Sequence, residues 1–368
     1  MAYLWFVLIV VAPHVLITDG ASGQARSTLA AARALAHAGY APVVTVSGSN
    51  SLAAASRYCA RAVTVPPAGE PGYAEAVGVE LASDDYVCVL PSSDAALLAL
   101  GFDVGHLLDK SRLLQHARRV GIPVPAQTRF ELWEELVASA DDLDYPLIVK
   151  PVVMGPSVVV AQGPEDLRRA GMPFEGPVLA QEWLGPPLTS AAGVVWEGRL
   201  VASVHQRYLR TWPPAAGGAC AAVSVERDVA TDAAVTELLG GFSGLFHAQF
   251  AAGRLIDLNP RLYGSLPLAV KAGVNVPAIY CDLVLGRRTE APKHGRPGVY
   301  YRSLEGELRW AAHHLFGRGR SPLRAVRALV PHRRVAHAVE SLTDPGPMLA
   351  RLRHVVGQGR HRRDRRSG

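Results

Sequence analysis

A carboxylate and an amide, Asp257 and Asn259, stand two positions apart in the sequence. The stretch 254–258 mixes polar and apolar residues, as a half-buried strand does. Because side chains alternate across a strand, Asp257 and Asn259 share one face. Their oxygens side by side suit a hard cation such as Mg²⁺. Pro260 ends the strand, and Arg261 follows beside the predicted metal ligands. A metal next to an arginine suits phosphoryl transfer, because both neutralise charge on phosphate oxygens.

A second strand is predicted just upstream, over 245–251, and Gly253 would form the turn between the two strands. Gln249 on this second strand could supply a third oxygen to the metal. A surface hairpin with ordinary polar residues explains the same stretch equally well. These residues alone do not separate the two interpretations.

The lysines are informative because the sequence contains only four Lys against thirty-four Arg. Lys110 opens an amphipathic helix predicted over 109–120, which Gly121 ends. Lys150 lies inside an apolar strand-like run in the stretch 143–151. A charged group in such a strand must find a charge partner or face a cleft. Lys150 therefore marks either a buried ion pair or a cleft.

The N-terminal part of the chain alternates predicted strands and helices. A strand over 14–19, a glycine-containing turn, a helix over 27–38 and a strand over 42–46 make a βαβ unit of the Rossmann kind. A dinucleotide fingerprint would have glycine where Arg26 stands and an acidic residue after the second strand, and neither is present. We favour a tight βα turn without cofactor. An NAD(P)-dependent reductase built on 14–105 remains an alternative.

The hairpin motif resembles that of a known family. Asp257-Leu-Asn-Pro-Arg261 is similar to the metal-binding Glu-x-Asn-Pro-Arg of the ATP-grasp superfamily, with Asp in place of Glu. Gln249 on the preceding strand has a precedent in carbamoyl phosphate synthetase-like members. The resemblance covers 106–288 and points to carboxylate–amine ligases and to the ATP-binding domain of the carbamoyl phosphate synthetase large chain.

Further motifs follow in the order that this family has. Asp109-Lys110 resembles the opening of the ATP-grasp domain, and Val-Lys-Pro around Lys150 resembles its phosphate-binding strand. The resemblance implies that both lysines bind ATP phosphates. It also implies a phosphate-covering flap at Gly155 and Ser157. The residues matching the adenine-binding hinge are Gln181, Glu182, Trp183 and Leu184.

The resemblance implies an ATP-grasp ligase that activates a carboxylate as an acyl phosphate and couples it to an amine or similar nucleophile. Asp257, Asn259 and Gln249 would bind Mg²⁺ or Mn²⁺. Arg261 and Lys150 would be the catalytic residues, because they stabilise the transferring phosphoryl group.

Two features leave the activity open. The site has only one carboxylate, and the flap has few glycines, so a non-catalytic, decayed ATP-binding protein is an alternative. Arg207 and Arg210 suit an anionic substrate, although solvated arginines explain them equally well.

The resemblance implies a mixed α/β protein. It would have a Rossmann-like N-terminal pre-ATP-grasp domain, a two-lobed α+β ATP-grasp fold and a helical C-terminal appendage. The expected divisions are an apolar leader (1–13), the pre-ATP-grasp domain (14–105), the ATP-grasp domain (106–288), the appendage (289–356) and a basic disordered tail (357–368). The leader is too short to span a bilayer alone. An overlong start, a weak membrane anchor and a packed extra strand all explain it, and we favour the first.

The net charge of +6 comes from the C-terminal region. From residue 318 onward the chain has thirteen Arg and three acidic residues, whereas the rest has 25 basic and 29 acidic residues. No specific nucleic-acid partner and no firm membrane association are expected, although the basic tail could give salt-sensitive binding to nucleic acid or acidic lipid. The four cysteines show no metal or redox spacing and are interpreted as buried thiols of a cytoplasmic protein. The expected partners are small carboxylates and amines, and a homodimer is left open.

Overall fold

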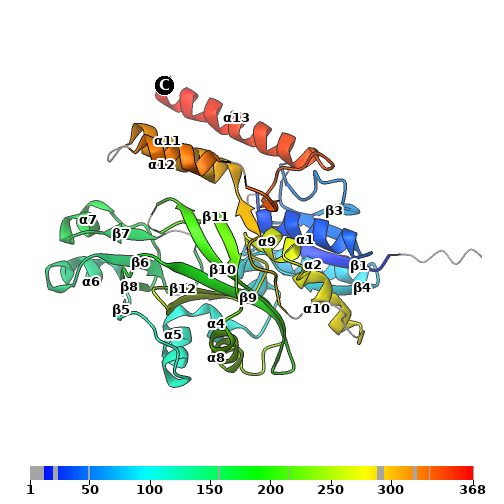
Figure 1. Cartoon of the computed structure of the whole chain (residues 1–368), viewed down its shortest axis with the longest axis horizontal. Coiled ribbons are helices and arrows are strands. Elements are labelled where there is room, and N and C mark those ends of the chain that lie inside the picture. The colour runs from blue at the N-terminus through cyan, green and yellow to red at the C-terminus, as the bar shows by residue number, and fades with distance from the viewer. Residues whose placement is uncertain are drawn as a thin grey trace, which may run out of the picture.

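A computed structural model gives the structure of the chain, in which the described residues are 12–19, 24–48, 50–155, 158–214, 216–287, 294–317, 321–330 and 332–367. The expected leader lies almost wholly outside them, and so does the glycine-containing turn at 20–23. Over these residues the chain is a mixed α/β protein with three sheets. Figure 1 shows the large sheet between a parallel sheet and a small antiparallel sheet.

The N-terminal sheet has four parallel strands in the order β3-β2-β1-β4. Their bounds are β1 (His14–Thr18), β2 (Ala41–Val46), β3 (Arg61–Thr64) and β4 (Tyr86–Leu90). The helices of this part are α1 (Arg26–His37), α2 (Tyr73–Ala82) and α3 (Asp94–Ala99). The run Val15–Ile17 is fully buried, which explains why it reads as a continuous apolar segment.

A short helical connection leads to the second sheet. It consists of α4 (Gly105–Leu108) and α5 (Lys110–Arg119). Asp109 caps α5, because its carboxylate accepts hydrogen bonds from the backbone N–H groups of Ser111 at 2.9 Å and Arg112 at 3.0 Å. The cap fixes the position of Lys110, the first residue of the helix.

The small sheet is antiparallel, in the order β5-β8-β6-β7. Its strands are β5 (Gln127–Phe130), β6 (Leu147–Pro151), β7 (Val159–Ala161) and β8 (Val178–Glu182). Three short helices accompany it: α6 (Trp133–Ala138), η1 (Ala140–Asp142) and α7 (Pro164–Arg169). They form a separate small core around Trp133, Leu136 and Phe174.

The large sheet has seven strands in the order β13-β12-β9-β10-β11-β14-β15. Its first five strands are β9 (Leu188–Trp196), β10 (Arg199–Trp212), β11 (Gly218–Val225), β12 (Gly244–Ala251) and β13 (Arg254–Asn259). Gly193 allows β9 and β10 to approach closely, because a Cβ atom there would lie 2.0 Å from the carbonyl oxygen of Ala202.

Three helices pack near this sheet: α8 (Val229–Leu239), α9 (Leu266–Lys271) and α10 (Val276–Val284). The bounds of α8 follow from its two ends. Asp228 caps its start by accepting from the N–H of Ala230 at 3.0 Å. Gly240, with φ of 54°, ends it.

The segment 289–356 is not solely helical, which corrects the expectation of a helical appendage. It contains α11 (Leu304–Phe316) and α12 (Pro322–Leu329), but also β14 (Tyr300–Arg302) and β15 (Val335–His337). β14 pairs with β11 and covers what would otherwise be an unpaired strand edge. Strands of three residues carry too little alternation to be read from sequence.

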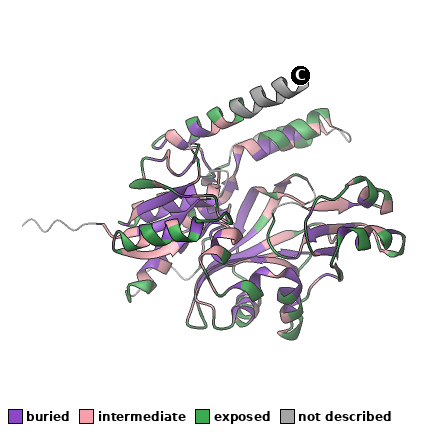
Figure 2. Cartoon of the chain, turned by 180° about the vertical axis from the view of Figure 1, so that it is seen from behind, coloured by how far each residue is buried: buried purple, intermediate pink, exposed green. Residues whose placement is uncertain are grey.

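The C-terminal residues 357–368 were expected to be a disordered tail. Instead α13 (Gly346–Ser367) continues through nearly all of them. Arginine has a high helix propensity, so the basic composition is compatible with a helix. Within the described part of the chain, no helix is long and apolar enough to cross a membrane. Figure 2 shows buried residues along the sheets and exposed residues on the outer helices.

Candidate active site

The predicted hairpin is formed by β12 and β13. Ala252 and Gly253 form its turn, with φ of 46° and 77°, as a two-residue hairpin turn requires. The register places Gln249 directly opposite Asp257. Directly opposite residues of an antiparallel pair project on the same face, so the two predicted metal ligands lie together.

Asn259 and Arg261 extend this cluster. The amide Nδ2 of Asn259 donates to Oδ2 of Asp257 at 3.4 Å. Nη2 of Arg261 donates to Oδ1 of Asn259 at 2.8 Å. Arg261 thus lies beside the predicted ligands, as expected.

Asp94 of α3 holds Arg261 in this position. Nε of Arg261 lies 2.5 Å from Oδ1 of Asp94, and Nη1 donates to the carbonyl oxygen of Leu262 at 3.1 Å. Both charged side chains are about four-fifths buried. Sequence reasoning missed Asp94, because it lies 167 positions away and no local motif marks it.

A hydrogen-bonded chain orients Gln249. Its Nε2 donates to the hydroxyl of Tyr208 at 2.9 Å, and that hydroxyl lies 3.2 Å from Nε2 of His247. Burial raises the pKa of Tyr208 to about 12. Burial, and then the charge of Arg261, lowers the pKa of His247 to about 3. His247 is therefore neutral near pH 7, and it stacks on Tyr263 with ring centroids 4.5 Å apart.

The hydrogen bonds among Gln249, Tyr208 and His247 determine which end of the Gln249 side chain is available. Because Nε2 is used by Tyr208, the carbonyl oxygen Oε1 is the end left for a cation.

Lys150 lies next to the hairpin. Its Nζ donates to the carbonyl oxygen of Ile256 at 2.7 Å, and the residue is only 7% exposed. Burial lowers the pKa of Lys150 to about 8; the charge of Asp257 raises it, and that of Lys110 lowers it. Lys150, which the sequence predicts to face a cleft or a charge partner, is therefore buried beside Asp257.

Lys110 is the second buried lysine of this region, at 8% exposed. Its backbone N–H donates to the carbonyl oxygen of Val152 at 2.9 Å, which joins α5 to the end of β6. Its ammonium makes no hydrogen bond or ion pair with any residue that the structure describes. Two buried cations close together favour an anion between them.

No protein-family model matches the chain. A D-alanine–D-alanine ligase from Pseudomonas fluorescens is 29% identical over 111 residues, which is 28% of this chain. The chain matches only 33% of the length of that relative.

Solved structures match over more of the chain. An L-amino acid ligase from Bacillus licheniformis superposes with a TM-score of 0.56 at 14% identity, over 76% of this chain and 75% of that one. The N5-carboxyaminoimidazole synthetase from Staphylococcus aureus, complexed with ADP, gives 0.59 at 13% identity, over 78% and 80%. These proteins are all ATP-grasp proteins. The chain has the ATP-grasp fold.

The segment expected to be the ATP-grasp hinge consists of the last two residues of β8 and the two residues after it. Gln181 is 4% exposed, and its Oε1 is buried without a hydrogen-bond partner. The backbone N–H groups of Glu182 and Trp183 donate to Ala126 and Pro146, at 2.9 and 3.1 Å. The carboxylate of Glu182 also pairs with Arg254, 3.1 Å away.

Leu184 differs from its neighbours, because its backbone N–H makes no hydrogen bond with a residue that the structure describes. The glycine of the expected flap, Gly155, has φ of 107° and lies against Pro151. Ser157 lies outside the described residues.

The two arginines expected to face a substrate have different environments on β10. Arg210 is paired with Glu307, with Nη2 2.5 Å from Oε1, and stacks over the Trp310 ring. Arg302 also pairs with Glu307, at 3.0 Å. Arg210 therefore contributes to a buried ion-pair network, whereas Arg207 is exposed.

The donors of the hairpin fit Mg²⁺, because one carboxylate and amide oxygens are hard ligands. Asp257 and Oε1 of Gln249 are available, while Oδ1 of Asn259 is shared with Arg261. Among the described residues, no group of three or more His, Cys, Asp or Glu could hold a metal ion. Such a cation would depend on the phosphates of a nucleotide for further ligands.

Proposed function

We propose that the chain is an ATP-dependent ligase that joins a small carboxylate to an amine or similar nucleophile. The observation that carries the proposal is the cluster at one end of the hairpin. Asp257 and Gln249 face each other there, and the buried Lys150 lies against the same strand. A cation site beside a buried ammonium suits the charge of a polyphosphate.

ATP would bind between the small sheet and the hairpin. Lys110 and Lys150 would hold its phosphates, and Gly155 with Ser157 would cover them. The adenine would contact the hinge, where the backbone N–H of Leu184 is available. The residues assigned to the hinge are Gln181, Glu182, Trp183 and Leu184.

The reaction would have two displacements. A carboxylate oxygen of the substrate attacks the γ-phosphorus, the bond from that phosphorus to the β–γ bridging oxygen breaks, and ADP leaves. The amine nitrogen then attacks the carbonyl carbon of the acyl phosphate, the carbon–oxygen bond to phosphate breaks, and the nitrogen loses a proton. Arg261 and Lys150 would stabilise charge on the transferring group. Mg²⁺ or Mn²⁺, when bound by Asp257 and the neighbouring amides, neutralises phosphate charge.

The remaining parts would have supporting roles. We propose that 14–105 is a Rossmann-like pre-ATP-grasp domain, that 106–288 is the ATP-grasp domain, and that the C-terminal residues form an appendage. A cytoplasmic location and a homodimer belong to the same proposal.

A catalytically inactive ATP-binding protein is the second candidate. Two observations favour it: Asp257 is the one carboxylate among the proposed ligands, and Arg261 is already paired with Asp94. That ion pair occupies Nε of Arg261, so this atom could contact a transferring phosphoryl group only after the pair with Asp94 breaks.

One experiment separates the two candidates. The full chain is incubated with Mg-ATP and pairs of carboxylates and amines, and the release of ADP and phosphate is measured. Release that needs both substrates supports the ligase. Binding of Mg-ATP without release, in every pair tested, supports the inactive binder.

A further inference from the structure

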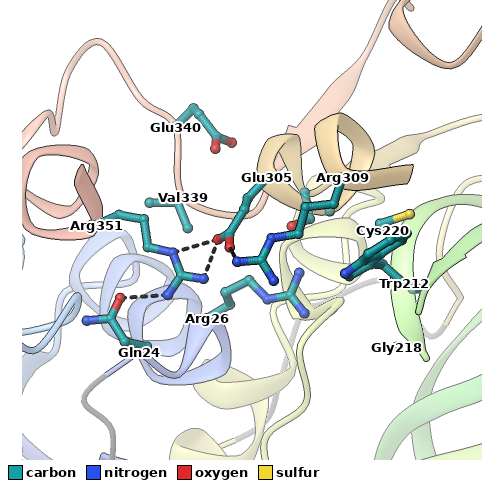
Figure 3. A pocket seen from close by; sticks show the side chains of 13 residues that line it. Gln24, Arg26, Trp212, Gly218, Cys220, Glu305, Arg309, Val339, Glu340 and Arg351 are labelled. Carbon is teal, nitrogen blue, oxygen red and sulfur yellow. Dashed lines mark hydrogen bonds and ion pairs between the residues drawn. The ribbon is translucent and has the colours of Figure 1, made fainter. Parts of the chain in front are cut away.

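The last three helices, α11, α12 and α13, lie together at one end of the molecule (Figure 1). The backbone N–H of Ser321, just before α12, donates to the carbonyl oxygen of His314 in α11 at 2.8 Å. Glu305 of α11 accepts from Nε of Arg351 in α13 at 2.7 Å, as Figure 3 shows. These contacts join the three helices, and α11 and α13 line a cavity of about 290 Å³ together with Arg26.

Helix α12 has a buried side and an exposed apolar side. It packs against α11, and Ala325 and Ala328 on its buried side are each 1% exposed. Leu323 and Val326 are instead 64% and 63% exposed, and Val330 at the end of the helix is 46% exposed. Residues three or four positions apart are neighbours on a helix surface, so these three side chains form one apolar stripe, here called the α12 stripe.

The neighbouring helices expose further large apolar side chains. Phe316, at the end of α11, is 78% exposed. On α13 the exposed apolar residues are Leu349, Leu352, Val355 and Val356. Single exposed apolar residues are ordinary on a protein surface, whereas a group of them marks an interaction site. The outer side of these helices is therefore a candidate interaction surface.

Arginines border the α12 stripe. Arg324 and Arg327 are exposed on α12 and form no ion pair with any residue that the structure describes. Arg333 and Arg334, which follow the helix, and Arg353 of α13 are exposed as well. The exposed charge around the stripe is therefore positive.

Acidic groups do not offset this charge. Between residues 321 and 356 the chain has two acidic residues, and one of them, Asp344, is 1% exposed and paired with Arg33 at 2.8 Å. The other, Glu340, has a buried Oε2. In the sequence, 357–368 add five Arg against one Asp. The surface thus combines aliphatic side chains with unbalanced positive charge.

This combination distinguishes three kinds of partner. A nucleic acid would pair with the arginines, but its bases stack on aromatic rings, and the α12 stripe is aliphatic. A second copy of the chain would bring the same arginines together across a two-fold interface, and like charges repel. An anionic lipid surface suits both features, because arginines contact its phosphates while aliphatic side chains enter the boundary between headgroups and acyl chains.

We propose that α12, with its bordering arginines and α13, is a peripheral docking surface for a membrane of anionic lipids. Leu323, Val326 and Val330 lie in the boundary between headgroups and acyl chains, and Arg324 and Arg327 pair with lipid phosphates. The surface holds the chain against the membrane without spanning it. The proposal does not depend on the proposed ligase function, which uses other residues.

The test measures co-sedimentation of the full chain with lipid vesicles, without nucleotide. Vesicles of equal parts phosphatidylglycerol and phosphatidylcholine should bind the chain, and vesicles of phosphatidylcholine alone should not. Binding to the anionic vesicles should fall steeply as NaCl is raised from about 0.05 M to about 0.5 M, because salt screens the arginines.

Two double variants separate charge from apolar contact. Arg324→Gln with Arg327→Gln should weaken binding about 25-fold, since each arginine near an anionic membrane contributes about fivefold. Leu323→Gln with Val326→Gln should weaken binding about tenfold or more at unchanged net charge, because two aliphatic side chains no longer enter the membrane.

Matched controls carry the same changes elsewhere on the exposed surface. Arg169→Gln with Arg199→Gln removes the same charge, and Val79→Gln with Val229→Gln removes two exposed aliphatic side chains. Both controls should bind vesicles like wild type. The thermal midpoint of each variant, measured in parallel, shows that it is folded.

Several results would overturn the proposal. The anionic vesicles fail to bind the chain, neutral vesicles bind it equally well, or either double variant of α12 binds like wild type. A short DNA duplex or single-stranded RNA that binds more tightly than the anionic vesicles, with no loss in the aliphatic variant, would assign the surface to nucleic acid. A dimer in analytical ultracentrifugation that the aliphatic variant dissociates would assign the α12 stripe to a second copy of the chain.

Discussion

Replacing Asp257 with Asn should separate catalysis from nucleotide binding. The substitution keeps the shape of the side chain and its contact with Asn259, but removes the one negative charge among the proposed ligands. A cation that bridges the phosphates would lose its charged ligand. We expect the rate of ADP release to fall on the order of 10²–10³-fold, as when one electrostatic contact to the transition state is lost. Nucleotide affinity should fall less, because Lys110, Lys150 and the hinge are unchanged.

The same substitution should change the pH dependence of nucleotide binding. Lys150, with a pKa of about 8, loses its positive charge as pH rises, so ATP affinity should decline from about pH 7 to about pH 9. The charge of Asp257 raises the pKa of Lys150, so its removal should move the decline to lower pH.

The assay is calorimetric titration with Mg-ATP across this pH range, combined with steady-state ADP release. Asp142→Asn is the matched control, because Asp142 is an exposed carboxylate of η1. The reasoning is refuted if Asp257→Asn turns over like wild type, or if its binding curve moves to higher pH.

Three further predictions concern single residues. Lys150→Ala should weaken ATP binding more than it lowers the turnover of bound ATP, which nucleotide titration and saturation kinetics together would show. Glu307→Gln should destabilise the fold by about 3–5 kcal/mol in chemical denaturation, because it leaves Arg210 and Arg302 without their buried carboxylate; an unchanged midpoint would contradict this. His247 has its pKa lowered to about 3 in the fold, so the free energy of unfolding should fall as pH drops from about 6.5 towards 3; His247→Gln should flatten that slope in thermal melts.

The hairpin and its neighbouring lysine could be predicted because their signals are local. A polar pair two positions apart on a strand, with a glycine turn upstream, determines which residues face each other, and the register of Gln249 with Asp257 confirms it. Lys150 was predicted to face a cleft or a charge because it lies in an apolar strand, and it is buried beside Asp257.

Other features could not be predicted, because they depend on contacts between distant parts of the chain. Asp94 reaches Arg261, and Tyr208 reaches Gln249, across separations of 167 and 41 residues. The strands β14 and β15 have three residues each, and only their pairing with the large sheet defines them. Arg26 counted against a dinucleotide site in the sequence, but its place in a cavity emerges only from packing of the C-terminal helices.

The most direct test of the proposed function is the fate of the carboxylate oxygen. A substrate carboxylate labelled with oxygen-18 is incubated with the full chain, Mg-ATP and an amine, and the released phosphate is analysed by mass spectrometry. Attack of the carboxylate on the γ-phosphorus predicts that each phosphate carries one labelled oxygen and that ADP is the nucleotide product. Unlabelled phosphate, AMP as the product, or no turnover with any carboxylate and amine would contradict it.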